Sequence, residues 1–119
     1  MPDAPSEGEV WLVNFQEGGE RPAVVVSRNQ LNRGRYILVV PCTSARLPDR
    51  TAFPNYVHLP RGVAGLTRDC LAQAHLIQPV DASILMQRLG ILGPERLSEV
   101  LRAIAWVIDL FDTVGISDT

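Results

Sequence analysis

Two short apolar segments of this chain each carry, at one end, polar groups that could act on a phosphate. Arg21 precedes the run 22–26, and Thr43 and Ser44 follow the run 37–42. The branched residues of both runs favour strands, and a strand end can hold a side chain in fixed geometry. A guanidinium offers a planar fork of donors to phosphate oxygens, and a hydroxyl offers one more. These residues therefore indicate an anion site.

The elements that must position these groups are mostly strands. Strands are predicted over residues 9–15, 22–28, 36–42, 55–59 and 86–92. Gly18 and Gly19 are typical of a turn that closes a hairpin. Asp81 is suited to capping a short turn before the last strand. The pattern indicates a small, mainly β fold.

Residues 70–77 alternate in a way that predicts one further strand. Leu71, Gln73 and His75 would lie on one face, and Cys70, Ala72, Ala74 and Leu76 on the other. A strand with a packed face and a solvated face has this period of two. If the first set is solvated, Gln73 and His75 would line a groove beside Arg21.

The end of the chain predicts an amphipathic helix. Pro94 suits the first helical turn, and apolar residues then recur at spacings of three and four, at Leu97, Leu101, Ile104, Ile108 and Phe111. The helix should pack on the strands. Trp106 is expected in the core, with a subunit contact as the alternative.

Taken together, these landmarks resemble the MazF/PemK family of toxin endoribonucleases. The resemblance is carried by the segments 8–15, 21–27, 41–44 and 65–70 and by the closing helix, roughly residues 7 to 112. It implies an SH3-like barrel, mainly β with a C-terminal α-helix (PemK/CcdB-like), that dimerises and cleaves single-stranded RNA without a metal or other cofactor. It also implies that the catalytic arginine is Arg21 and the catalytic threonine is Thr43. The products would carry 2′,3′-cyclic phosphate and 5′-hydroxyl ends.

The chain departs from the family pattern after Asp69. Many relatives carry Asp-Gln-Ile-Arg-Thr where this chain reads His75-Leu76-Ile77-Gln78-Pro79. Because histidine changes charge near neutral pH, His75 is a candidate catalytic acid or base in place of the missing carboxylate. The alternative is a structural hydrogen-bonding role.

Composition bounds the class of protein. A length of 119 residues suits a single domain over 1–119, with flexible termini expected outside the core. Cys42 and Cys70 have apolar neighbours and no zinc-ligand spacing, so buried thiols are expected. The first residues lack a signal-peptide pattern, and no segment approaches the ~20 apolar residues of a membrane span. A soluble cytoplasmic protein is expected.

The charge is distributed unevenly. All cationic side chains except the histidines are arginines, and residues 21–68 hold eight of them with one acidic residue, a formal charge of +7, against −9 in the rest of the chain. A basic middle is expected of a phosphate-binding face. Candidate RNA-binding residues are Asn14, Arg28, Ser44, Arg46, Arg50, Arg61 and Gln73. The alternative is that these arginines are solvated on loops and that Arg21 pairs with Glu17 or Glu20.

The resemblance also implies a partner. An antitoxin with an acidic, flexible tail would compete with RNA for the basic groove. Two other functions remain open: a gyrase-directed toxin of the same fold, and a catalytically inactive binding module. Gyrase-directed toxins end in an aromatic-Gly-Ile motif, whereas this chain reads Val114-Gly115-Ile116 near its end. The nuclease is the favoured function.

Overall fold

The runs of valine, isoleucine and leucine form antiparallel strands in the computed structural model, which describes residues 4–44 and 53–117. The strands are β1 (Glu9–Asn14), β2 (Glu20–Val25), β3 (Tyr36–Thr43), β4 (Tyr56–Leu59), β5 (Cys70–Gln73), β6 (Gln78–Asp81) and β7 (Leu85–Ile91). Four short 3₁₀ turns connect them: η1 (Gln16–Gly18), η2 (Val63–Gly65), η3 (Ala74–Leu76) and η4 (Ala82–Ile84). Within residues 4–44 and 53–117 one α-helix, α2 (Pro94–Val107), follows.

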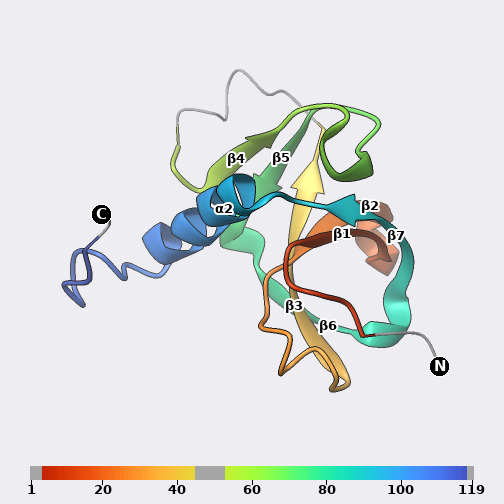
Figure 1. Ribbon diagram of the computed structural model, residues 1–119, viewed down its shortest axis with the longest axis horizontal. Helices are drawn as coiled ribbons and strands as arrows, with labels where there is room; N and C mark the ends of the chain where they lie inside the picture. The colour runs from red at the N-terminus through yellow and green to blue at the C-terminus, as the bar shows by residue number, and fades with distance from the viewer. Residues whose placement is uncertain (1–3, 45–52, 118–119) are drawn as a thin grey trace.

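The strands form one curved sheet in the order β4-β5-β3-β2-β1-β7, with β6 also paired to β3 (Figure 1). Every strand pairing is antiparallel. The prediction of a mainly β fold with a C-terminal helix is confirmed. No helix in residues 4–44 and 53–117 combines the length and apolar character that crossing a membrane requires.

The sheet has a core on each face. Val24 and Val26 pack into one cluster, with Val40 and Leu59, whereas Ala23 and Val25 belong to the other, with Ile37 and Val39. The alternation of side chains along β2 produces this division because successive residues point to opposite faces. The central strands are therefore buried on both sides, which fixes their ends firmly.

The single strand predicted over residues 70–77 is wrong. β5 ends at Gln73, η3 turns the chain, and β6 begins at Gln78. The break lets the chain change position along β3, since β5 pairs at Cys42 and Thr43 whereas β6 pairs with residues 36–39. Leu71 and Gln73 are buried, so β5 has no solvated face.

The helix begins at Pro94 as predicted but ends earlier than expected. Asp109 adopts a left-handed conformation with φ 57°, and the Leu110 N–H donates to the Ala105 carbonyl at 2.9 Å. This is the hydrogen-bond pattern of a Schellman C-cap, which glycine usually occupies. Phe111 lies beyond the helix. Trp106 is 47% exposed, so its expected place in the core is wrong.

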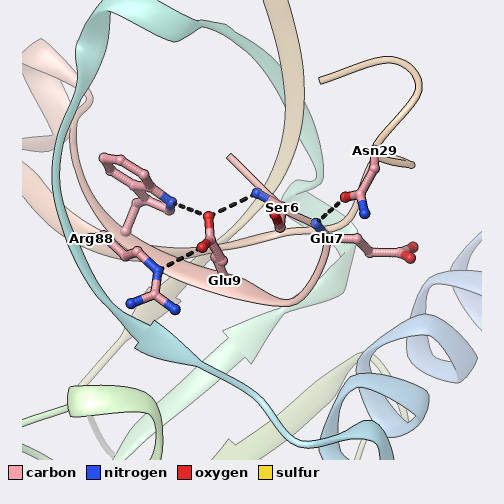
Figure 2. A network of polar contacts seen from close by, with 6 residues as sticks. Ser6, Glu7, Glu9, Asn29 and Arg88 are labelled. Carbon is pink, nitrogen blue, oxygen red and sulfur yellow. Dashed lines mark hydrogen bonds and ion pairs between the residues drawn. The ribbon is translucent and has the colours of Figure 1, made fainter. Parts of the chain in front are cut away.

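A buried carboxylate joins the N-terminal segment to β1 and β7 (Figure 2). Glu9 is 9% exposed and accepts from the Ser6 N–H at 2.7 Å, the Trp11 Nε1–H at 3.1 Å and Arg88 Nε at 2.5 Å. Burial raises the pKa of the Glu9 carboxyl, but these hydrogen bonds and the charge of Arg88 outweigh it and hold the pKa below 4.5. The network fixes β7 against β1.

Candidate active site

The two strand ends that the sequence singled out lie next to each other. β2 pairs with β3 through Ala23–Pro41, Val24–Val40 and Val25–Val39. The pairing ends at Ala23–Pro41, and Arg21 and Thr43 each lie two residues beyond it, at the same end of the two strands. On its other side, Thr43 pairs with Leu71 of β5. Both candidate residues are thus held by central, doubly buried strands.

Arg21 and Thr43 line one cleft of about 660 Å³. Its walls come from the β1–β2 hairpin, the end of β3, the segment 65–70, and β7. The lining residues are Leu12, Gly18, Glu20, Arg21, Pro22, Cys42, Thr43, Ser44, Gly65, Thr67, Arg68, Cys70 and Leu89. The cleft therefore combines two guanidinium groups, several hydroxyl groups and the Glu20 carboxylate with apolar side chains.

The tight β1–β2 turn positions the Arg21 side chain. Arg21 Nε donates to the Gly18 carbonyl at 2.8 Å, and Gly19 turns the chain with φ 74°. Arg21 is exposed, and within residues 4–44 and 53–117 it forms no ion pair with Glu17 or Glu20. The terminal nitrogens of its fork can therefore face a ligand in the cleft.

Thr43 is half-buried and Ser44 is exposed at the cleft. The neighbouring thiols of Cys42 and Cys70 are buried, as predicted. Burial raises the pKa of both thiols; Cys70 raises the pKa of Cys42 further, and the charge of Asp69 raises that of Cys70. The cysteines thus remain neutral packing groups, and the hydroxyls and guanidinium groups supply the polar chemistry.

Gln73 and His75 lie outside this cleft. The Asn55 amide nitrogen is 2.8 Å from His75 Nδ1, and the imidazole meets the Tyr56 ring edge-on at a centroid distance of 5.4 Å. The expectation that Gln73 and His75 share a solvated face beside Arg21 is wrong, because β5 ends before His75. A proton-transfer role for His75 stays a prediction.

The other predicted RNA-binding residues are dispersed. Arg28 lies three residues beyond the end of β2 that is opposite Arg21. Arg61 lies in the β4–β5 connection, where its backbone N–H donates to Asp69 Oδ1 at 2.7 Å. The Asn14 side chain accepts from the Gln16 N–H at 2.9 Å. Arg46 and Arg50 lie outside the described residues.

Sequence reasoning missed two cleft residues, Thr67 and Arg68. Arg68 entered only as part of the basic middle of the chain, although the segment 65–70 was recognised as a landmark. Gly65 in this segment was the available signal, because glycine often marks a close approach between two backbones. Within the part of the chain that the structure describes, no group of three or more His, Cys, Asp or Glu residues could hold a metal ion.

The chain is similar to known proteins over most of its length. Residues 6–108 match the family described as the PemK-like, MazF-like toxin of type II toxin-antitoxin systems. The probable endoribonuclease MazF5 of Mycobacterium tuberculosis is 31% identical over 110 residues, which cover 92% of this chain and 97% of that protein.

Solved structures show the same fold. An endoribonuclease from a mycobacterial species, in complex with its cognate antitoxin, superimposes with a TM-score of 0.77 at 27% identity and covers 90% of this chain and 97% of that one. A MazE-MazF structure from Deinococcus radiodurans gives a TM-score of 0.72 at 25% identity, with 89% and 96% covered. The chain belongs to the PemK-like, MazF-like family of toxins of type II toxin-antitoxin systems.

Proposed function

We propose that this toxin is an endoribonuclease that cleaves single-stranded RNA without a metal. The observation that carries the proposal is the meeting of Arg21 and Thr43, from adjacent strands, in one cleft. The names of the similar proteins support the class of activity, since both the mycobacterial relative and the mycobacterial structure are named as endoribonucleases.

RNA carries its own nucleophile in the 2′-hydroxyl. A nuclease that uses it must align this group with the adjacent phosphate and stabilise the charge that develops on the phosphate oxygens. Arg21 would hold the non-bridging oxygens through its fork of donors, and Thr43 and Ser44 would donate further hydrogen bonds. The 2′-oxygen would bond to phosphorus as the P–O5′ bond breaks, with water taking the 2′-hydroxyl proton and supplying one to the leaving 5′-oxygen. The products would therefore have 2′,3′-cyclic phosphate and 5′-hydroxyl ends.

We also propose two protein partners. Similar structures contain an antitoxin, one described as cognate and the other as MazE. An acidic antitoxin tail would occupy the cleft through Arg21 and Arg68 and so exclude RNA. The toxin itself would form a homodimer, as the resemblance to the family implies, and the exposed apolar side chains Leu101, Trp106 and Ile108 on α2 and just beyond it are candidates for its interface.

The experiment that tests the activity is incubation of the protein with a long RNA transcript in excess EDTA, followed by analysis of the fragment ends. We expect discrete fragments with cyclic phosphates, produced by the wild type and lost in Arg21→Ala. A matched fully 2′-O-methylated oligonucleotide pool should remain intact because it lacks the nucleophile. Transcripts of several unrelated sequences that all remain intact would contradict the proposal.

A further inference from the structure

One wall of the cleft is formed by the segment after η2, which carries Thr67 and Arg68. Both residues are exposed. Arg68 comes from the β4–β5 connection, whereas Arg21 comes from the β1–β2 hairpin. The cleft thus receives guanidinium groups from two separate parts of the chain.

Close backbone contacts fix this segment on β7. A Cβ atom on Gly65 would lie 2.1 Å from the Leu89 carbonyl oxygen, and one on Gly90 would lie 2.5 Å from the Ala64 carbonyl carbon. Only glycine permits two backbones to approach so closely. Because Gly65 and Leu89 also line the cleft, this contact sets the position of the wall.

Two hydrogen bonds within the β4–β5 connection hold its backbone in place. The Gly62 N–H donates to the Leu66 carbonyl at 2.8 Å, and the Arg61 N–H donates to Asp69 Oδ1 at 2.7 Å. The acidic side chain next to Arg68 is thereby engaged by a backbone group. The backbone of Arg68 is held between these bonds and the start of β5.

Arg68 carries a charge that no ion pair in the described ranges neutralises. The two ion pairs found in residues 4–44 and 53–117 are Arg35–Asp81 and Arg88–Glu9. An exposed guanidinium beside a phosphate-binding cleft attracts a polyanion and can bind a phosphate through two hydrogen bonds. These are the properties of a backbone-binding residue.

We propose that Arg68 binds an RNA phosphate adjacent to the one that is cleaved. This inference rests on the proposed function, because it assumes that RNA enters the cleft. Arg21 and Thr43 would contact the reacting phosphate, and Arg68 would position the strand and contribute affinity. Since a phosphate contact carries no base information, Arg68 would strengthen binding to all sequences alike.

The test is binding to a fluorescein-labelled pool of random-sequence 2′-O-methyl RNA, measured by anisotropy at several salt concentrations. This probe carries phosphates but cannot be cleaved through the 2′-hydroxyl. For Arg68→Ala, we expect weaker binding and a salt slope lower by about 0.7, the value for one phosphate contact on a single strand. Arg68→Lys should keep the slope, because it keeps the charge.

The matched control is Arg33→Ala, which removes an exposed arginine from the β2–β3 connection, outside the cleft. We expect it to bind the pool as the wild type does. Equal slopes for Arg68→Ala and the wild type, or no binding of the pool by the wild type, would overturn the proposal. Wild-type binding with an Arg68-dependent slope, but no cleavage of natural transcripts, would overturn the nuclease proposal alone.

Discussion

Glu9 Oε2 lies 2.5 Å from Arg88 Nε, so an ion pair joins β1 to β7, the first and last strands along the chain. The same carboxylate accepts from Ser6 and Trp11 and thereby fastens the N-terminal segment. β7 in turn carries Leu89 and Gly90, which contact the segment that bears Arg68. The network is therefore connected to the cleft wall as well as to the sheet.

Removal of the Glu9 carboxylate should destabilise the fold. In Glu9→Ala, three donors lose their acceptor, and one of them is charged. We expect the free energy of unfolding to fall by about 2 kcal/mol, measured by urea denaturation at pH 7. Glu17→Ala, which removes an exposed carboxylate from η1, should stay within about 0.5 kcal/mol of the wild type. Equal effects of the two substitutions would contradict the role of the network.

The same carboxylate should give stability a dependence on acid pH. Its folded-state pKa is lowered, so its contribution is fully present above pH 4.5 and is lost as the pH falls through the lowered value. Glu9→Gln should therefore differ most from the wild type near neutral pH and least in strong acid. Denaturation series across this range would check it. A stability difference between the wild type and Glu9→Gln that increased in acid would contradict a lowered pKa for Glu9.

Arg21 and Thr43 should be required for cleavage and not for folding. We expect Arg21→Ala to lower the cleavage rate by about 10²- to 10³-fold, as loss of a donor to the transition state does, with circular dichroism unchanged. Arg21→Lys should recover only part of the rate, because lysine lacks the planar fork. Thr43→Val, which keeps the side-chain shape, should also lower the rate.

The control for this pair is Arg33→Ala, since Arg33 is exposed in the β2–β3 connection and lies outside the cleft. Its rate should equal that of the wild type under the same EDTA conditions. Wild-type rates in Arg21→Ala and Thr43→Val would remove both residues from the proposed chemistry.

His75 should not transfer protons in the cleft of its own chain. It contacts Asn55 and Tyr56, and the residues that line the cleft do not include it. We expect His75→Ala to leave the pH dependence of the cleavage rate unchanged, although it removes a hydrogen bond to Asn55. A changed pH profile would restore the catalytic prediction and would require His75 to reach the cleft of a partner subunit.

The sequence predicted where the central strands lie because uninterrupted runs of valine, isoleucine and leucine favour buried strands, although β2 spans Glu20–Val25 and not residues 22–28. The sequence also predicted that Arg21 and Thr43 lie close together, because each residue is at an end of one of these strands. It failed at residues 70–77, where the alternation fits a strand but the pairing shifts along β3. The prediction also placed the end of the helix too late. Asp109 occupies the left-handed position that ends the helix, and this position is usually recognised in a sequence because it is a glycine.

The place of Arg68 in the cleft depends on contacts between backbones far apart in sequence, which no local pattern reports. Gly90→Ala tests that dependence. A methyl group there would meet Ala64 at 2.5 Å, and neither backbone can move without disturbing β7 or η2. We expect a loss of about 1–3 kcal/mol in the free energy of unfolding, as for overpacked sites, together with weaker binding of the 2′-O-methyl RNA pool.

Gly93→Ala is the matched control, because its added methyl would meet nothing within 4 Å and its φ is −67°. It should cost less than about 1 kcal/mol, for the weaker helix cap, and leave RNA binding unchanged. If Gly90→Ala kept both the stability and the RNA affinity of the wild type, the contact with Ala64 would not position the cleft wall.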